Sequence, residues 1–303
     1  MEALGARYNE SRGVAEPTVS VVVPTFNRQH TLVAAIASAL SQDGATVEVI
    51  VLDDSADGSA RAAVTSFDDG RVRYVPRATP SNGMPAIARN EGLALARGRF
   101  VQFLDDDDFL VDGALPALVD ALECNPATGV AIGTVVPFGD DPRVLEQQQQ
   151  YFADATERLR ANLGRRGLVA ALLFGPTLLV NSSCLVRRSC ANAVGGYSTD
   201  VPRCEDVEFF LRAIRRCGYV FVDRPVLRYR TGAPSLMHSL GHESPLLELS
   251  YRAIFRRYRR EHGVVEYLQL KALDRWQRWR APARPTGRTA PQPDDTVQSF
   301  PVA

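Results

Sequence analysis

Two hydrophobic patterns alternate along the first third of the chain: short β-branched runs, and longer segments with apolar residues three or four positions apart. The first pattern is typical of parallel strands that are buried on both faces, and the second of amphipathic helices. Strands and helices that alternate with short connections indicate a parallel sheet with helices on both faces. We predict strands at 18–23, 47–52, 72–75 and 100–104 and helices at 31–41, 58–67 and 86–96.

The pattern is less regular in the remainder of the chain. Residues 140–170 are polar and predict either a helix or a loop. Residues 251–280 predict a basic helical segment, because they contain nine Lys and Arg residues against three Asp and Glu residues. We also predict helices at 114–123 and 205–217 and strands at 129–136 and 178–186.

These patterns predict one large domain with additions at both ends. We expect a flexible leader over 1–16, a main domain over 17–240 with halves 17–112 and 113–240, a basic helical segment over 241–280, and a disordered tail over 281–303.

Composition excludes several classes of protein. The chain has 303 residues, with 35 Lys and Arg balanced by 35 Asp and Glu, so nothing favours nucleic acid as a partner. Its five cysteines are an odd number without a Cys-x-x-Cys pair, which favours free thiols in a reducing compartment. No apolar run is long enough to span a membrane. We therefore expect a cytoplasmic protein.

Acidic side chains gather where two predicted strands end, at Asp53-Asp54 and at Asp105 to Asp108. Ligands of open parallel sheets bind outside the carboxyl ends of the strands. Asp is also common in turns, and this alone could explain Asp53-Asp54. Four consecutive Asp residues repel one another, and a divalent cation is the usual compensation. The pattern therefore predicts a site for Mg²⁺ or Mn²⁺ and phosphate.

Four segments, in this order, resemble the motifs of the family 2 glycosyltransferases. The ordered set extends from about residue 17 to about residue 235 and is far more specific than any one match. The segments are Pro24-Thr25-Phe26-Asn27-Arg28, Asp53-Asp54-Ser55-x-Asp57-Gly58-Ser59, Ala88-Arg89-Asn90 leading into Asp105-Asp106-Asp107, and Cys204-Glu205-Asp206.

The resemblance implies a GT-A fold, which is a Rossmann-like α/β fold with a mostly parallel sheet, here followed by a C-terminal helical appendage. It also implies a hexosyltransferase that moves a sugar, with inversion, from a nucleoside-diphosphate donor to an acceptor hydroxyl. Carried over by position, Thr25, Phe26 and Arg28 would lie along the nucleoside. Asp54, or Asp53 if the register differs by one residue, would accept a hydrogen bond from the base.

Asp105 and Asp107 match the family's metal-binding D-x-D, although the four-Asp run leaves the register open by one residue. Asp107 would then be the direct ligand of Mg²⁺ or Mn²⁺, and Asp106 would contact the ribose or the donor sugar. Arg89 would lie near the donor or act as a structural partner of the acidic loops. His238 is a further candidate metal ligand or, equally, an ordinary loop histidine.

Glu205 and Asp206 match the "E-D" motif, whose second residue the resemblance makes the catalytic base, with Glu205 at the substrate site. An acceptor hydroxyl that attacks an anomeric carbon must lose a proton, which requires a carboxylate within reach. Negative charge in the first turn of a helix is also favourable in its own right, so the pair considered alone has a purely structural explanation.

The donor and acceptor are not determined by the sequence. We take a UDP-sugar as the first donor and leave a small molecule, a lipid-linked sugar and a polysaccharide as acceptors. Residues 251–280 could pack on the domain, contact an anionic membrane at its inner face, or bind a partner. A catalytically inactive nucleotide- or glycan-binding module is the alternative function. Asp-dependent phosphoryl transfer is disfavoured, because the single lysine, Lys271, lies beyond the predicted sheet.

Overall fold

The computed structural model describes residues 16–81, 84–161, 163–232 and 245–280. The leader and the tail expected at the two ends therefore lie outside the described residues, apart from Glu16. Within the described residues, the strands form one sheet in the order β3-β2-β1-β4-β7-β6-β8-β5. Their bounds are β1 Val19–Thr25, β2 Val47–Asp53, β3 Val72–Pro76, β4 Phe100–Phe103, β5 Phe109–Leu110, β6 Val130–Phe138, β7 Cys184–Arg187 and β8 Tyr219–Arg230.

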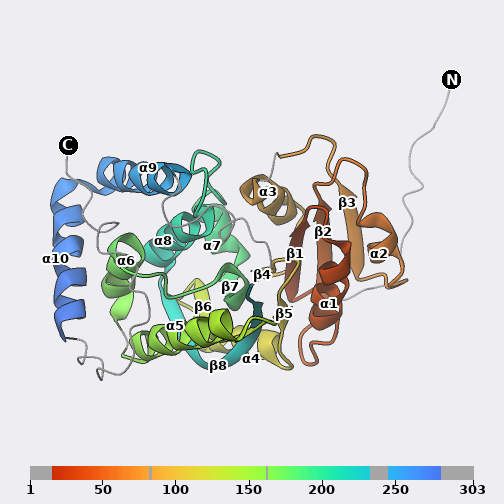
Figure 1. The fold of residues 1–303 in the computed structure, drawn as a ribbon, viewed down its shortest axis with the longest axis horizontal. Helices are drawn as coiled ribbons and strands as arrows, with labels where there is room; N and C mark the ends of the chain where they lie inside the picture. The colour runs from red at the N-terminus through yellow and green to blue at the C-terminus, as the bar shows by residue number, and fades with distance from the viewer. Residues whose placement is uncertain (1–15, 82–83, 162, 233–244, 281–303) are drawn as a thin grey trace.

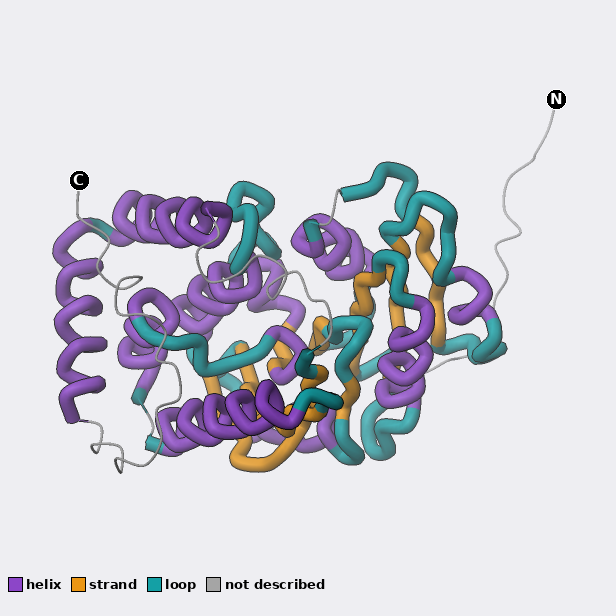
Figure 2. The backbone as a smooth tube through the Cα atoms, viewed as in Figure 1, coloured by secondary structure: helices purple, strands orange, loops and turns teal. Residues whose placement is uncertain are grey.

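The sheet is parallel in its first half and mixed in its second half. β1 pairs in parallel with β2 and β4, and β2 with β3, as the alternating pattern predicts. β7 is antiparallel to both β4 and β6, β6 is parallel to β8, and β5 is antiparallel to β8. The fold is the predicted GT-A arrangement, in which the sheet lies between layers of helices (Figures 1 and 2).

Helices cover both faces of the sheet. Along β1, Val22 belongs to one hydrophobic cluster, whereas Val21 and Val23 belong to the other, because successive side chains of a strand point to opposite faces. The first cluster includes residues of α3, α6 and α8, and the second includes residues of α1 and α4. The helices are α1 Gln29–Leu40, α2 Arg61–Thr65, α3 Pro85–Leu95, α4 Ala114–Cys124, α5 Pro142–Arg160, α6 Gly164–Phe174, α7 Arg188–Ala193, α8 Glu205–Cys217, α9 Pro245–His262 and α10 Val264–Arg280.

The second half departs from the sequence expectations in several places. Residues 140–170 fall mainly in two helices, α5 and α6. The strand expected over 178–186 is shorter, because Asn181–Ser183 form a 3₁₀ turn (η1) and β7 begins only at Cys184. The sequence patterns also missed β5, β8 and α7. β8 is partly exposed over most of its length and lacks a regular apolar alternation.

The predicted C-terminal appendage is present as α9 and α10. The two helices are separated at Gly263, whose positive φ of 84° is the left-handed conformation that commonly ends a helix. None of the described helices is both long enough and apolar enough to span a membrane. The five cysteines, all of which are described, are free, as expected.

Candidate functional site

The candidate site lies at the carboxyl ends of β1, β2 and β4. Thr25 is in register with Asp53 of β2, and Val22 is in register with Phe103 of β4, so the segments that follow these strands begin side by side. The Thr25 hydroxyl donates a hydrogen bond of 2.7 Å to Asp106. The parallel pairing therefore brings the first sequence motif into contact with the four-Asp run.

The side chains of Asp105 to Asp108 alternate in exposure. Those of Asp105 and Asp107 are 32% and 18% exposed, whereas Asp106 and Asp108 are buried. Two carboxylates at alternate positions are therefore accessible at the edge of the sheet, and the two others are directed into the protein.

Two arginines compensate part of this negative charge. Arg28 lies with Nη1 2.7 Å from Asp107 and 3.4 Å from Asp106. Arg89 is buried and lies with Nη2 2.8 Å from Asp105 and Nη1 2.6 Å from Glu205. Arg89 therefore connects the residue cluster after β4 to the first residue of α8.

Burial and mutual repulsion nevertheless raise the pKa of several carboxyl groups in the acidic run. Burial raises the pKa of Asp106 to about 7, while its hydrogen bond from Thr25 opposes the shift. Burial and the charge of Asp105 raise the pKa of Asp107. Burial likewise raises the pKa of Asp108, whose buried Oδ2 has no hydrogen-bond partner within the part of the chain that the structure describes.

These residues fit a divalent cation. Carboxylate oxygens are the hard ligands that Mg²⁺ and Mn²⁺ prefer, and added positive charge would relieve the repulsion that raises the pKa of Asp107. Two carboxylates do not complete a coordination shell, and no group of three His, Cys, Asp or Glu residues among the described ranges is arranged to hold a metal ion. The third expected ligand, His238, lies outside the described residues.

Asp53 and Asp54 have different surroundings. Asp53 closes the turn into α2, because it accepts hydrogen bonds from the backbone of Ser55 and Ala60 and from the Tyr74 hydroxyl. Asp54 faces the segment between β3 and α3, where it contacts other partners. These are Ser81, through the backbone N–H at 2.8 Å and Oγ at 2.6 Å, and the guanidinium of Arg77.

The "E-D" segment begins α8 close to these strand ends. Cys204 precedes it in a left-handed conformation, with φ of 57°, which turns the chain into the helix. Asp206 is partly buried, and burial together with the charge of Glu205 raises its pKa to about 6. A carboxylate with this pKa can both accept and hold a proton near neutral pH.

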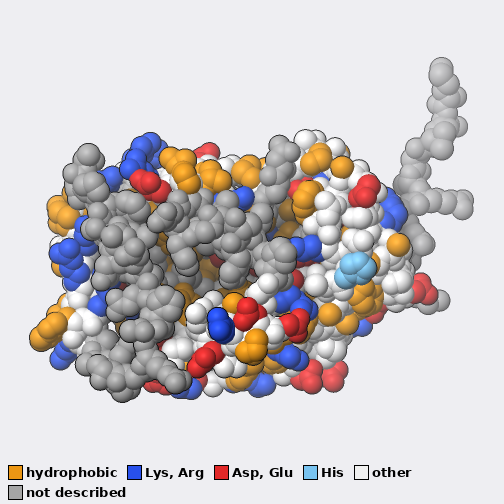
Figure 3. Space-filling model, in the orientation of Figure 1, with side chains coloured by type: hydrophobic (Ala, Val, Ile, Leu, Met, Phe, Trp, Pro, Cys, Tyr) orange, Lys and Arg blue, Asp and Glu red, His pale blue; other side chains and the backbone are white. Residues whose placement is uncertain are grey.

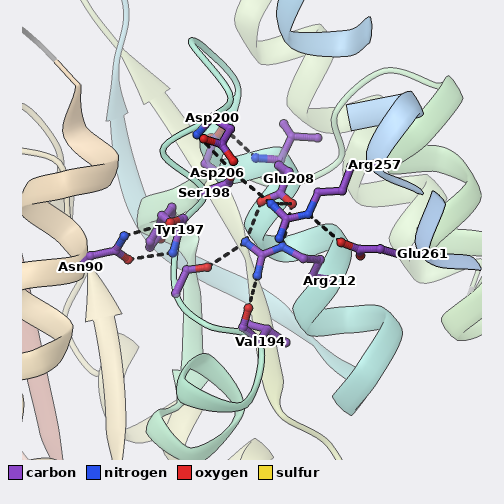
Figure 4. Close-up of polar contacts among 12 residues, drawn as sticks. Asn90, Val194, Tyr197, Ser198, Asp200, Asp206, Glu208, Arg212, Arg257 and Glu261 are labelled. Carbon is purple, nitrogen blue, oxygen red and sulfur yellow. Dashed lines mark hydrogen bonds and ion pairs between the residues drawn. The ribbon is translucent and has the colours of Figure 1, made fainter. Parts of the chain in front are cut away.

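A group of hydrogen-bonded side chains, formed by Asn90, Asn181 and Tyr197, packs against this segment. Tyr197 donates to Asn181 at 2.7 Å, stacks on Phe209 of α8, and exchanges two backbone hydrogen bonds with the side chain of Asn90. Asn181 also lies 3.4 Å from Asp105. These contacts join α3, η1 and α8, and Figure 4 shows the part between Asn90 and Tyr197.

Several contacts of the site could not be read from the sequence motifs. Arg77 and Ser81 hold Asp54, and Arg230 at the end of β8 lies with Nε 3.3 Å from the backbone oxygen of Asp107. Arg77 lies two residues after the end of the predicted strand 72–75, and this place near a strand end was the available sequence signal for its contact with Asp54. Phe26 is 49% exposed.

Several known proteins are similar to this chain in sequence. The model of the family "Glycosyl transferase family 2" matches residues 20–194, which is more than half of the chain. An uncharacterized protein of Mycobacterium tuberculosis, MT1568, is 32% identical over 69% of this chain and 65% of its own length. The Campylobacter jejuni GalNAc(5)-diNAcBac-PP-undecaprenol beta-1,3-glucosyltransferase is 44% identical over 34% of each chain. The chain thus spans less than two thirds of these relatives.

Solved structures share the fold at low sequence identity. S. aureus TarS 1–349, in complex with UDP-GlcNAc, aligns with a TM-score of 0.57 and 18% identity over 86% of this chain and 69% of its own. Glucosyl-3-phosphoglycerate synthase from Mycobacterium tuberculosis, in complex with Mn²⁺ and UDP-Glc, aligns with a TM-score of 0.50 and 21% identity over 80% of this chain and 79% of its own.

Proposed function

This chain belongs to glycosyl transferase family 2, and from this premise we propose that it transfers a sugar, with inversion, from a nucleoside-diphosphate donor to an acceptor hydroxyl. The main support is the contact of Arg89 with both Asp105 and Glu205, because one buried cation joins the D-x-D segment to the "E-D" segment. Departure of the diphosphate and deprotonation of the acceptor hydroxyl occur around the same sugar, so the segments proposed for these two roles must lie close together.

Asp105 and Asp107 are the proposed metal ligands, with His238 as the third. Their register is supported by the alternating exposure of the acidic run, in which these two carboxylates are the accessible ones. A bound Mg²⁺ or Mn²⁺ would stabilise the negative charge that develops on the departing diphosphate. Asp106 is the proposed contact to the ribose or donor sugar.

We propose Asp206 as the general base that removes the proton of the acceptor hydroxyl. Asp206 is only partly buried as a residue, and its raised pKa of about 6 matches proton transfer near neutral pH. Glu205 acts at the same site by holding Arg89 in place.

The nucleoside would lie along Thr25, Phe26 and Arg28, with Asp54, or Asp53 in the alternative register, accepting a hydrogen bond from the base. The exposed ring of Phe26 offers a stacking surface for a base. UDP is the first nucleotide to test, because both solved structures compared above contain a UDP-sugar.

For the acceptor, a lipid-linked sugar is the first of the three classes to test. Its support is the C. jejuni relative, which is named for a diphosphoundecaprenol-linked acceptor. A small molecule and a polysaccharide are the other two classes.

The test is calorimetric titration of UDP, GDP and dTDP, each with and without Mn²⁺. We expect one nucleotide, UDP first, to bind more tightly with Mn²⁺, and Asp107→Asn to remove the metal-dependent part by removing a charged ligand. Asp120→Asn is the matched control, because Asp120 is an exposed carboxylate on α4. Folded protein that binds none of the three nucleotides would contradict the proposal. Binding without turnover of any donor would instead identify an inactive binding module.

A further inference from the structure

The last helix, α10, carries apolar side chains on two opposite faces. One face packs into the protein through Tyr267 and Leu270, which are 8% and 1% exposed. The opposite face is apolar as well but open to solvent. At 3.6 residues per turn it covers an arc of about 120°. Its large residues, between 49% and 81% exposed, are Val264, Val265, Leu268, Trp276 and Trp279.

The exposed charge of α10 is cationic. Both acidic residues of the helix are turned inward and paired: Glu266 with Arg215 at 3.0 Å, and Asp274, which is fully buried, with Arg278. Arg275 is exposed within the apolar arc, and Arg280 lies over the ring of Trp276 at 4.7 Å. Cationic and hydrophobic side chains are interspersed along the edge of the molecule that α10 forms (Figures 1 and 3).

A helix with this composition has the properties of an interfacial helix. Trp rings prefer the boundary between water and acyl chains, and Arg side chains extend their charge to lipid phosphates while their stems lie against apolar groups. We propose that the outward face of α10 docks on an anionic lipid bilayer. The proposal rests on α10 alone and does not depend on the sugar chemistry of the site.

A second copy of the chain fits this face less well. In a symmetric dimer the same patch meets itself, so the interface would hold two copies of the Arg275 and Arg280 charges, and the patch itself supplies no acidic side chain to balance them. The segment 281–303 fits poorly too, because its two Arg and two Asp residues give it no net charge to complement the cations. An anionic bilayer supplies both opposite charge and apolar depth.

The two tryptophans of the chain make the test direct, because both lie on this face. Trp emission of the full-length protein therefore reports on the face without a label. We expect a shift to shorter wavelength and protection from acrylamide when vesicles of phosphatidylglycerol and phosphatidylcholine are added at low salt. Vesicles of phosphatidylcholine alone should have a much smaller effect, and added salt should weaken binding to the anionic vesicles.

Co-sedimentation with the same vesicles separates the contribution of the cationic side chains to binding from that of the tryptophans. Arg275→Gln should weaken binding about fivefold, since one cation near an anionic surface contributes on that scale. Arg73→Gln is the matched control: Arg73 is an exposed arginine on β3, at the other end of the molecule (Figure 1), and its loss should leave binding unchanged. The double variant Trp276→Ala/Trp279→Ala should weaken binding at least about tenfold. All four residues are exposed, so circular dichroism should show unchanged folding.

Two results would overturn the proposal. One is the absence of any emission shift and of any co-sedimentation with anionic vesicles at low salt. The other is Trp emission that is already shifted and protected from acrylamide without vesicles, because the face would then be covered in solution, by another copy or by another part of the chain. Neither result bears on nucleotide binding, so the proposed sugar transfer is tested separately.

Discussion

At the scale of single residues, the two arginines of the site differ in how firmly they hold their carboxylates. The Arg28 side chain is 34% exposed and that of Arg89 only 6%. Burial alone would lower the pKa of Arg89, but the charges of Asp105 and Glu205 outweigh it and raise that pKa. The ion pair of Arg28 is weakened by solvent, so Asp107 can exchange it for another cation more readily than Asp105 can exchange Arg89.

The proposed base gives a prediction at this scale. We expect Asp206→Asn to lower kcat at least about 100-fold, the usual contribution of a general base, and to leave UDP binding intact. Asp200→Asn, which changes a nearby exposed carboxylate, is the control and should keep full activity. Turnover of Asp206→Asn within tenfold of wild type would contradict the assignment.

The pH dependence follows from the pKa of about 6. Asp206 is a base only when it is ionised, so wild-type kcat should rise between pH 5 and pH 7 and then level off. The stability effect has the opposite sign: because the pKa is raised on folding, ionising Asp206 costs stability as the pH rises through 4 to 6. Asp206→Asn should therefore be no less stable than wild type at pH 7 in urea unfolding.

At the scale of elements, α8 holds the loop that precedes it. Glu208 of α8 is buried and forms a two-bond ion pair with Arg212 one turn later, with both distances 2.6 Å. Arg212 also donates to the backbone oxygens of Val194 and Gly196, and Figure 4 shows it between the helix and this loop. One arginine therefore ties the loop to the helix that carries Asp206.

Arg212→Ala should accordingly be costly. Among the described residues, it would leave buried Glu208 with only the longer contact to Arg257, at 3.3 Å, and two carbonyls without the donor that Arg212 supplies. We expect a loss of about 3 kcal/mol in the free energy of unfolding, measured in urea. Arg252→Ala is the control, because Arg252 pairs with Glu248 at the same spacing on a largely exposed surface and should contribute less than about 0.5 kcal/mol. Equal losses for both variants would refute this account.

At the scale of the whole molecule, the C-terminal helices are part of the main core. Ile254 and Tyr258 of α9 and Tyr267 and Leu270 of α10 belong to the same hydrophobic cluster as α6 and α8. The expected division of the chain after residue 240 stays a prediction. This shared cluster indicates that α9 and α10 fold together with the second half of the sheet.

Substitutions at Leu270 and Leu268 test whether α9 and α10 fold together with the rest of the chain. The two residues lie two positions apart on opposite faces of α10 and are 1% and 55% exposed. We expect Leu270→Ala to lower the free energy of unfolding of the whole chain by about 2–5 kcal/mol in a single transition. Leu268→Ala should change it by less than about 0.5 kcal/mol. A separate early transition in Leu270→Ala, with the remainder unaffected, would mean that the helices are an independent unit.

The sequence predicted the first half of the fold better than the second half. Strands such as β1 and β2 are buried on both faces and produce an apolar run that can be recognised without neighbours. β8 is half exposed and β5 has two residues, so neither produces such a run. Asn181 follows an apolar stretch but begins a 3₁₀ turn, in which its side chain donates to the backbone oxygen of Phe103 and accepts from the Tyr197 hydroxyl; the apolar pattern does not specify these distant partners.

The sequence by itself therefore determined the parallel first half and the acidic strand ends, because hydrophobic period and turn chemistry act between near neighbours along the chain. Only the tertiary structure decided which distant groups meet. Arg89 and Glu205 are 116 positions apart, and no local pattern specifies their contact. The tertiary structure likewise decided which face of α10 is buried, because the helix is apolar on two faces. Its neighbours α6 and α9 cover one of these faces and leave the other open to solvent.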